Sequence, residues 1–241
     1  MTRLVLIRHG QSEWNLQNRF TGWVDVNLTE KGIGEAQQTG RLLKKLGGHY
    51  KAAYTSFQTR AIKTLNLALE EMDMLWLPVT KSWRLNERHY GGLTGLDKKE
   101  TAEKHGDAQV KVWRRSYDTP PPPMDPGSEH NPASDPRYEG LSKGDIPLTE
   151  SLKLTLDRVE PYWESDIKPR LVDGEDLLIA AHGNSLRALV KLLMNVSNDD
   201  IVSVEIPTGN PLVIELEAGT TNPIEARYLD EGRATALPPL S

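Results

Sequence analysis

Residues 4–15 read LVLIRHGQSEWN, and this stretch decides the fold. Four branched apolar residues in a row are typical of a strand buried on both faces, and the run is too short for a convincing helix. The run then changes abruptly to Arg8, His9 and Gly10, which bring a permanently charged guanidinium, a possible nucleophile and a backbone that can approach a ligand closely. Open α/β sheets bind their ligands at the carboxyl ends of their strands. We therefore expect an anion site here, with His9 carrying a phosphoryl group.

Composition narrows the class of protein. The chain has 241 residues, of which 37% are hydrophobic and 26% charged, as in globular proteins that dissolve in water. No apolar run approaches the roughly 20 residues of a membrane-spanning helix, and Met1–Arg3 lead into a strand without a signal-peptide pattern, so we expect a cytoplasmic protein. The absence of cysteine excludes disulfides, cysteine zinc sites and thiol nucleophiles. A net charge of -5 argues against nucleic acid as a partner, but not against a small anionic substrate.

The rest of the chain alternates between strand and helix patterns. Thr29 is a predicted helix cap, and the helix that it starts ends at Gly47–Gly48. The pattern predicts further strands at 51–56, 78–80 and 176–181, helices at about 62–72, 101–117, 148–171 and from 186 onward, and a late hairpin at 212–216 and 224–228. This alternation predicts one domain over residues 1–241, a three-layer α/β/α sandwich around a mostly parallel sheet.

One stretch interrupts this alternation. Residues 120–123 are four prolines, and more proline and glycine follow as far as residue 140, so regular helix or central strand is excluded. Such a stretch is either a linker or a long excursion folded over a site. We favour a lid-like insertion at about 97–147, because the alternation resumes after it. The polar tail from 231 to 241 is predicted to be mobile.

Two apolar strands far apart in the sequence both end in His-Gly. The first is followed by His9–Gly10, and the strand at 176–181 is followed by His182–Gly183. Parallel strands of one sheet bring their carboxyl ends to the same edge, so the two imidazoles are expected to face each other across one crevice. The second pair also precedes a helix, whose free N–H groups and dipole favour an anion.

Other charged candidates fall on neighbouring loops. Arg60 lies early in the helix that follows the second strand, and Glu87 follows the third strand among cations. A carboxylate in that setting can exchange a proton with a hydroxyl group. Lys98 and Arg114–Arg115 precede the proline-rich stretch, and they can close over a ligand with several negative charges.

Together these segments resemble the 2,3-bisphosphoglycerate-dependent phosphoglycerate mutases of the histidine phosphatase superfamily. The Arg-His-Gly motif is common to the superfamily, whereas ERHYGG at 87–92, the double arginine and the proline-rich insertion point to the mutases. The similarity covers nearly the whole chain, and it carries the following segments: RHGQSEWN at 8–15, Thr21–Gly22, Arg60, ERHYGG at 87–92, Lys98, Arg114–Arg115, the four prolines and HGNSLR at 182–187. The tail after Arg233 has no charged stretch that aligns with the family.

The resemblance implies a role for each matching residue. His9 would be the phosphorylated nucleophile and Glu87 the proton donor and acceptor, while Arg8, Arg60 and His182 would stabilise the transferring phosphoryl group. Substrate contacts would come from Arg8, Gly10, Gln11, Ser12, Glu13, Trp14, Asn15, Thr21, Gly22, Arg60, Glu87, Arg88, His89, Tyr90, Lys98, Arg114, Arg115, Gly183 and Asn184. The family also implies 2,3-bisphosphoglycerate as the primer of the phosphoenzyme, a small phosphorylated carboxylic acid as substrate, and a homo-oligomer, most simply a dimer. We expect no metal, because arginines and histidines supply the positive charge, and no membrane partner, because no apolar run is long enough to cross a bilayer.

Three other functions stay open at this point. A phosphatase of the same superfamily would pass the phosphoryl group to water. A non-catalytic polyanion-binding module would keep the arginines but would not need His9, Glu87 and His182 together. A histidine metal site is less favoured, because neither His-Gly pair has the close ligand spacing of common zinc motifs. Glu87 can also be a surface ion-pair partner, Arg114–Arg115 a solvated helix face, and His89 a structural residue.

Overall fold

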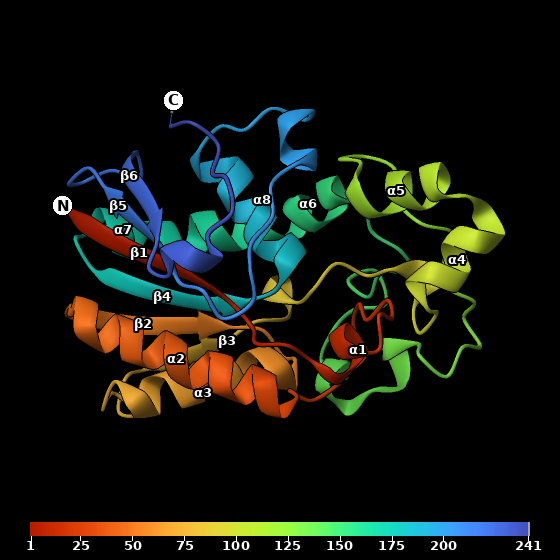
Figure 1. The fold of residues 1–241 in the computed structure, drawn as a ribbon, viewed down its shortest axis with the longest axis horizontal. Helices are drawn as coiled ribbons and strands as arrows, with labels where there is room; N and C mark the ends of the chain where they lie inside the picture. Colours follow the sequence, from red (N-terminus) through yellow and green to blue (C-terminus); the bar gives the residue numbers. More distant parts are fainter. Residues whose placement is uncertain (241) are drawn as a thin grey trace.

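The structure, a computed structural model, describes residues 1–240, and its centre is a six-stranded sheet between two layers of helices (Figure 1). The strands are β1 (Thr2–Arg8), β2 (Tyr50–Thr55), β3 (Val79–Lys81), β4 (Asp176–Ala181), β5 (Leu212–Leu216) and β6 (Pro223–Tyr228). The helices are α1 (Glu13–Leu16), α2 (Glu30–Leu46), α3 (Thr59–Glu71), α4 (Lys98–His105), α5 (Asp107–Arg115), α6 (Leu152–Tyr162), α7 (Lys168–Val172) and α8 (Gly183–Leu193).

The strand order is β3-β2-β4-β1-β5-β6, and β5 alone runs against the others. The predicted mostly parallel sheet is therefore confirmed. β1 and β4 lie side by side, with Arg8 opposite Ala181, and the amide of His9 donates to the carbonyl of Ala181 at 3.0 Å. This register brings the two His-Gly turns to one edge of the sheet.

β1 is buried on both faces, which explains its uninterrupted apolar sequence. Leu4 and Leu6 pack with the helices α6 and α8, while Val5 and Ile7 pack with α2 and α3 on the opposite side. Figure 1 shows these two helix pairs above and below the strands. The predicted three-layer sandwich is thus confirmed.

The loop after β1 packs directly on helix α2. The helix starts as predicted, with the Thr29 hydroxyl accepting from the amide of Gly32 at 3.1 Å, and it ends at Gly47 with φ at 71°. A Cβ on Gly10 would lie 2.2 Å from the carbonyl oxygen of Gly32, and a Cβ on Gly32 would lie 2.1 Å from that of Gln11. Both glycines are needed because two backbones meet here.

Two predicted helices differ from the structure. The single helix expected at 101–117 is wrong: α4 and α5 are separate, because Gly106 between them has φ at 85°, a left-handed conformation that cannot continue a helix. The helix expected from residue 148 begins only at Leu152, where the Ser151 side chain caps it. Beyond Pro161, which lies inside α6, a π-helical turn at Trp163–Ile167 continues into α7.

Helices α4 and α5 form a lobe beyond the carboxyl ends of the parallel strands (Figure 1). The chain then returns through the proline-rich stretch, which forms only short 3₁₀ turns. The prediction that this stretch contains no regular helix or central strand is confirmed. Pro122 accepts a hydrogen bond from the amide of Gly92 at 2.7 Å, so the prolines pack on the loop that carries Glu87.

The polar tail folds back on the end of the sheet. Arg233 donates to the carbonyls of Thr208 and Gly209, and the Thr235 hydroxyl donates to that of Glu205. Its predicted mobility stays a prediction, and Ser241 lies outside the described residues. Within residues 1–240, no helix has the length and apolar character needed to cross a membrane.

Candidate active site

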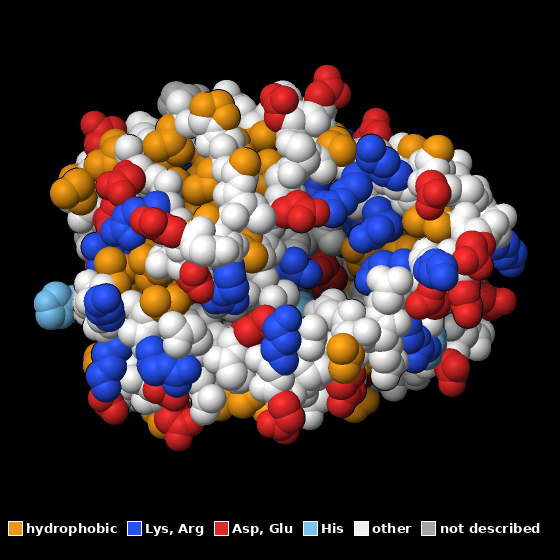
Figure 2. Space-filling view, in the orientation of Figure 1, with side chains coloured by type: hydrophobic (Ala, Val, Ile, Leu, Met, Phe, Trp, Pro, Cys, Tyr) orange, Lys and Arg blue, Asp and Glu red, His pale blue; other side chains and the backbone are white. Residues whose placement is uncertain are grey.

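A cleft opens at the carboxyl ends of β1 and β4, beneath the α4–α5 lobe, and it is strongly cationic. Seven Arg or Lys side chains line it against two carboxylates. Figure 2 shows blue side chains gathered along one side of this hollow, with red at its floor. The lining residues are Arg8, His9, Asn15, Arg19, Phe20, Thr21, Arg60, Glu87, Tyr90, Lys98, Arg114, Arg115, Gly183, Asn184, Arg187, Glu205 and Ile206. Such a cleft suits a small ligand with several negative charges.

His9 is held in the form that a nucleophile requires. Its Nδ1 lies 2.7 Å from the carbonyl oxygen of Gly10, and because a carbonyl only accepts, Nδ1–H is the donor. The other nitrogen, Nε2, then carries a lone pair. Burial, with the charges of Arg60 and Arg8, lowers the pKa of His9 well below its usual value of 6.5. The imidazole is therefore neutral at pH 7, with Nε2 able to attack.

Two arginines flank His9. Arg60 is buried, and it donates to the carbonyls of Gly22 and Val24, both at 2.9 Å. Burial lowers the pKa of Arg60 to about 10, which leaves it protonated at neutral pH. Arg8 donates to the carbonyl of Ile206 at 2.7 Å, while its buried Nε has no protein partner within residues 1–240. That free donor is available to an anion in the cleft.

Glu87 is fixed through one of its two oxygens. Its Oε1 accepts from the backbone amides of Arg88 at 2.8 Å and Asn184 at 3.1 Å. A Cβ on Gly183 would lie 3.7 Å from Glu87 Oε2 and 3.5 Å from Nε of Arg8. The glycine thus keeps open the space between this carboxylate oxygen and the guanidinium.

His182 lies behind the cleft, fully buried, with its ring centroid 5.0 Å from that of His9. The predicted juxtaposition of the two imidazoles is therefore present. Nε2 of His182 lies 2.8 Å from the hydroxyl of Ser56, and His182 forms a capping box with Ser185 at the start of α8. Burial, together with the charge of Arg60, lowers the pKa of His182 well below 6.5, so this ring is neutral as well.

A buried ion pair anchors the loop that presents Glu87. Arg158 binds Glu150 through Nε at 2.7 Å and Nη2 at 3.0 Å, and it also donates to the backbone carbonyls of residues 84, 86 and 87. Glu150 in turn accepts from the amide of His89 at 2.7 Å. Gln58 binds the same loop from the other side, accepting from the amide of Glu87 at 2.8 Å. These three anchoring residues, Arg158, Glu150 and Gln58, were not predicted to belong to the site.

Twelve of the predicted site residues line the cleft, and the others lie around it. The twelve are Arg8, His9, Asn15, Thr21, Arg60, Glu87, Tyr90, Lys98, Arg114, Arg115, Gly183 and Asn184. The predicted residues outside the lining are Gly10, Gln11, Ser12, Glu13, Trp14, Gly22, Arg88, His89 and His182. Their binding roles stay predictions.

Several of these outer residues have clear structural contacts. Ser12 caps α1 and exchanges hydrogen bonds with Asn15, and the Gln11 amide donates to Glu35. His89 Nδ1 accepts from the amide of Gly91 at 3.0 Å, and burial lowers the pKa of His89 to about 4. These contacts favour the structural interpretation of His89.

Arg88 is buried next to the cleft, and its positive charge acts on the lining residues Tyr90 and Arg187. Its Nη2 donates to the carbonyl of Arg114 at 3.1 Å, and its guanidinium lies 4.6 Å from the ring centroid of Tyr90. Nε and Nη1 of Arg88 have no partner in the described part of the protein. These donors are therefore uncommitted within the fold.

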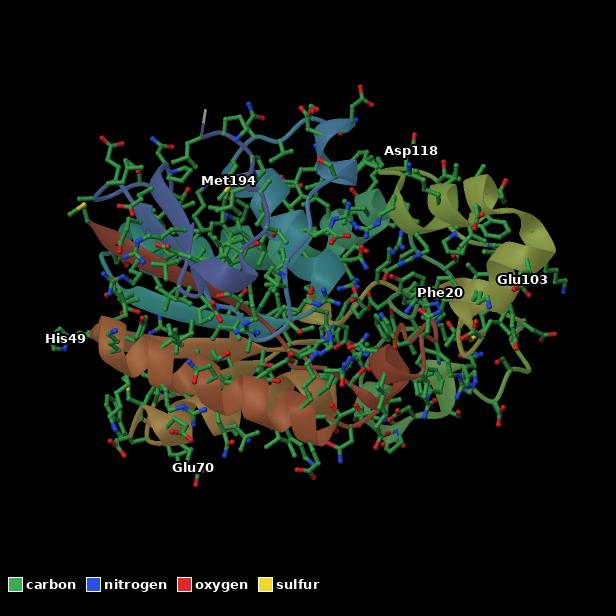
Figure 3. All side chains as sticks on the ribbon, in the orientation of Figure 1. Phe20, His49, Glu70, Glu103, Asp118 and Met194 are labelled. Atoms are coloured by element: carbon green, nitrogen blue, oxygen red, sulfur yellow. The ribbon has the colours of Figure 1, made fainter. Side chains whose placement is uncertain are left out.

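Five lining residues were not predicted to be part of the site: Arg19, Phe20, Arg187, Glu205 and Ile206. Arg187 follows the second His-Gly pair by four residues, so its position on the first turns of α8 was a usable signal. Arg19 lies 4.0 Å above the Trp14 ring, and Phe20 lies between the α1 loop and the α4 lobe in Figure 3. Glu205 pairs with Arg115 across the mouth of the cleft. Nothing in the local sequence marks Glu205.

Comparison with known proteins defines the class. The family model of the histidine phosphatase superfamily (branch 1) matches residues 4–226, and the chain belongs to this superfamily. Two solved structures share its fold: a mycobacterial glucosyl-3-phosphoglycerate phosphatase (20% identity, TM-score 0.69, 95% of this chain and 97% of the other) and the α-ribazole phosphatase of Shigella flexneri (22%, 0.65, 99% and 100%).

Curated relatives are much more similar in sequence. A 2,3-bisphosphoglycerate-dependent phosphoglycerate mutase of Maricaulis maris is 62% identical over 240 residues, covering 100% of this chain and 99% of the relative. The enzyme of the same name from Erythrobacter litoralis is 61% identical, covering 96% of this chain and all of the relative. The similarity therefore runs through the lobe and the proline-rich stretch as well as the sheet.

Proposed function

We propose that this protein is a phosphoglycerate mutase that interconverts 3- and 2-phosphoglycerate through a phosphohistidine at His9. One observation carries the proposal: a neutral His9 with a free Nε2 lies in the same cationic cleft as the free carboxylate oxygen of Glu87. Relatives more than 60% identical over nearly their whole length are named for this activity. The reaction belongs to glycolysis and gluconeogenesis.

The cleft fits a small phosphorylated carboxylic acid. Arg8 and Arg60 beside His9 would hold the transferring phosphoryl group, and Lys98, Arg114 and Arg115 would hold the remaining anionic groups. The buried donor of Arg8 that lacks a protein partner supports this fit, because such groups are normally hydrogen-bonded. The same set would accept 2,3-bisphosphoglycerate, which supplies the phosphoryl group that primes His9.

The chemical step uses His9 and Glu87 together. The free hydroxyl of 3-phosphoglycerate attacks the phosphorus on His9, the P–Nε2 bond breaks, and Glu87 takes the hydroxyl proton. The doubly phosphorylated product then passes its other phosphate to His9, and Glu87 returns the proton to the oxygen that leaves. Because phosphoryl transfer depends mainly on positioning and charge stabilisation, the fixed arginines contribute most of the catalytic effect.

Exclusion of water separates a mutase from a phosphatase of the same fold. We propose that the insertion at 97–147 is a lid, since it brings Lys98, Arg114 and Arg115 to the cleft from outside the sheet. A covered phosphohistidine transfers to a bound hydroxyl rather than to water. Measuring phosphate release and isomer formation on one sample decides between the two activities, and a mutase forms isomer in large excess.

The decisive experiment follows acid-labile label from 2,3-bisphosphoglycerate. Wild-type protein should take up label on His9, and His9→Ala should take up none. His49→Ala is the matched control, because His49 is exposed at the far end of the molecule (Figure 3). Label retained by His9→Ala, or a labelled wild type that forms no isomer, would contradict the proposal.

Metal dependence is tested in the same assay. Within residues 1–240 no group of three or more His, Cys, Asp or Glu side chains is arranged to hold a metal ion. We propose that arginines supply the positive charge, so isomerisation should require bisphosphoglycerate and should persist in the presence of a chelator. Loss of activity on chelation, restored by a divalent cation, would overturn this part of the proposal.

We also propose that residues 1–241 form one domain, that the protein acts in the cytoplasm without nucleic-acid or membrane partners, and that it assembles as a homodimer. The family resemblance supports the dimer, and the single sheet shared by residues from both ends of the chain supports one domain. Light scattering during size-exclusion chromatography measures the assembly, and a mass equal to one chain would contradict the dimer.

A further inference from the structure

Arg187 is a buried cation in the wall of the cleft that the proposed mechanism does not yet use. It lies on α8 and is only 4% exposed. Burial, with the positive charges of Arg88 and Arg115, lowers the pKa of Arg187 to about 10, so the guanidinium is still protonated at neutral pH. A buried charge beside two like charges is unfavourable unless its own contacts compensate for it. The contacts of Arg187 therefore indicate why the fold keeps it.

The guanidinium of Arg187 orients the side-chain amide of Asn184. Nη1 of Arg187 donates to Oδ1 of Asn184 at 2.9 Å, and Nη2 donates to the carbonyl of Ile201. A guanidinium only donates, so the Asn184 atom that faces it is the amide oxygen. The amide nitrogen, Nδ2, then lies 3.2 Å from the hydroxyl oxygen of Tyr90. Arg187, itself bound to Ile201, thus determines which way round the amide sits.

The orientation of the amide decides what Tyr90 can do. Because Nδ2 of Asn184 only donates, the hydroxyl oxygen of Tyr90 is the acceptor in their contact. The hydroxyl hydrogen of Tyr90 is not used in this contact, and it is left for a group in the cleft. Asn184 and Tyr90 both line the cleft, so this orientation places N–H and O–H donors at its wall in place of a carbonyl oxygen.

We propose that Arg187 is a positioning residue, which fixes the Asn184 amide so that Asn184 and Tyr90 present donors to an anionic oxygen of the substrate. This inference rests on the proposed function, which places phosphate and carboxylate groups in the cleft. The opposite orientation would set two donors, Nδ2 and Nη1, against each other. It would also turn Oδ1 toward Tyr90, whose hydroxyl would then donate to Asn184 and not to the substrate. Donors that are fixed before the substrate arrives bind it without the cost of reorganisation.

Arg187 acts on the side chain of Asn184 and not on its backbone. The backbone amide of Asn184 donates separately to Oε1 of Glu87, at 3.1 Å. Loss of Arg187 should therefore leave the position of Glu87, and the proton transfer that it performs, largely unchanged. The inference predicts a rise in KM with little change in kcat.

Replacing Arg187 with glutamine tests this prediction. Glutamine can accept as well as donate, so Arg187→Gln releases the amide of Asn184. Loss of a hydrogen bond to a charged ligand lowers affinity about tenfold or more, so the KM for 3-phosphoglycerate and its dissociation constant in calorimetry should rise about tenfold. Arg187→Lys keeps a cation that only donates, and it should restore most of the affinity.

Lys191→Gln is the matched control. Lys191 lies one turn further along α8 and does not line the cleft, and its ammonium donates to the carbonyl of Val196. The substitution removes one positive charge from the same helix without touching the Asn184 amide. It should leave KM, kcat and the dissociation constant unchanged.

A double-mutant cycle separates the orientation of the amide from the charge of Arg187. If Arg187 acts through Asn184, Arg187→Gln should weaken binding of 3-phosphoglycerate by about twofold or less when Asn184 is already alanine. If the charge of Arg187 acts directly on the substrate, the tenfold cost should persist in that background. A cost above about fivefold in the Asn184→Ala protein would overturn the inference.

The orientation of the amide is also measurable without any ligand. Correlation of the Nδ2 hydrogens with Cγ gives one set of signals for each asparagine, and loss of a set in Asn184→Ala assigns it. We expect the Asn184 signals to move toward those of exposed asparagines in Arg187→Gln and to stay in place in Lys191→Gln. Unchanged signals in Arg187→Gln would overturn the inference. A protein that binds no 3-phosphoglycerate would instead refute the proposed function, while these signals still report the orientation.

Discussion

Replacing Arg158 with methionine should destabilise the protein by about 4 kcal/mol. The Arg158 and Glu150 side chains are only 8% and 3% exposed, so neither charge can turn to water when its partner is lost. Removing one partner of a buried ion pair costs about 3–5 kcal/mol, because the other charge stays buried and unpaired. Three loop carbonyls would also lose their donor. Methionine keeps the apolar stem, which places the estimate in the middle of that range.

Urea unfolding followed by fluorescence measures this cost. With an m value of about 3 kcal/mol per molar, the midpoint should fall by more than about 1 M. Asp157→Asn is the control on the same helix, since the Lys153–Asp157 pair is about half exposed at 52% and 51%, and its loss should leave the midpoint unchanged. The double variant of Arg158→Met with Glu150→Met should cost at least about 2 kcal/mol less than the sum of the singles.

A cost below about 1 kcal/mol for Arg158→Met, or two single costs that simply add, would contradict this prediction. Either result would mean that water reaches the pair, or that the loop at 84–89 is held mainly by Gln58. A stable Arg158→Met protein with reduced kcat would still show that the anchor positions Glu87, because Nη2 of Arg158 binds the carbonyl of Glu87 directly at 3.0 Å.

Three further predictions follow from the site. Glu87→Gln keeps the shape but cannot take a proton, so kcat should fall about 10²–10⁴-fold with KM nearly unchanged; equal losses in both would indicate a structural role. Gly10→Ala should cost about 2 kcal/mol or more in urea unfolding, because its Cβ would meet backbone 2.2 Å away, whereas Gly34→Ala has open space and should be neutral or stabilising. Stability should fall below pH 6.5, since the native pKa values of His9, His89 and His182 are lowered and the unfolded chain then binds more protons. The loss is up to 1.36 kcal/mol per pH unit for each histidine, and for His89 it should level off near pH 4, so His89→Gln should show a smaller pH slope in acid titrations of the urea midpoint.

Much of the fold was accessible from the sequence because its signals are local. The uninterrupted apolar run before Arg8 identified a strand buried on both faces, and Thr29 and Gly47 identified the ends of α2. The break at Gly106 was missed, because apolar residues at helical spacing continue after it and a single glycine is tolerated in many helices. Only the left-handed backbone at that position shows that the helix ends.

The residues of the candidate site also fall into two groups: those that local sequence signals reveal and those that they do not. His9 and His182 were accessible because each follows a strand and the sheet rules bring strand ends together. Arg158, Glu150 and Ser56 were not, because their contacts join segments about 60 to 130 residues apart and depend on side-chain directions that spacing does not encode. Glu205 was missed for the same reason, since its pairing with Arg115 joins positions 90 residues apart in the sequence.

The positive charge of the cleft serves the chemistry twice. A histidine with an ordinary pKa near 6.5 is partly protonated at neutral pH, and a protonated ring cannot attack phosphorus. Burial, Arg60 and Arg8 lower the pKa of His9, so the nucleophilic form persists at a pH where a free imidazole would begin to lose it. The same two guanidiniums would also balance the negative charge of the phosphoryl group once it arrives. Neutralising Arg8 or Arg60 should therefore raise the pKa of His9 as well as weaken phosphate binding, and these two effects would reinforce each other at acid pH.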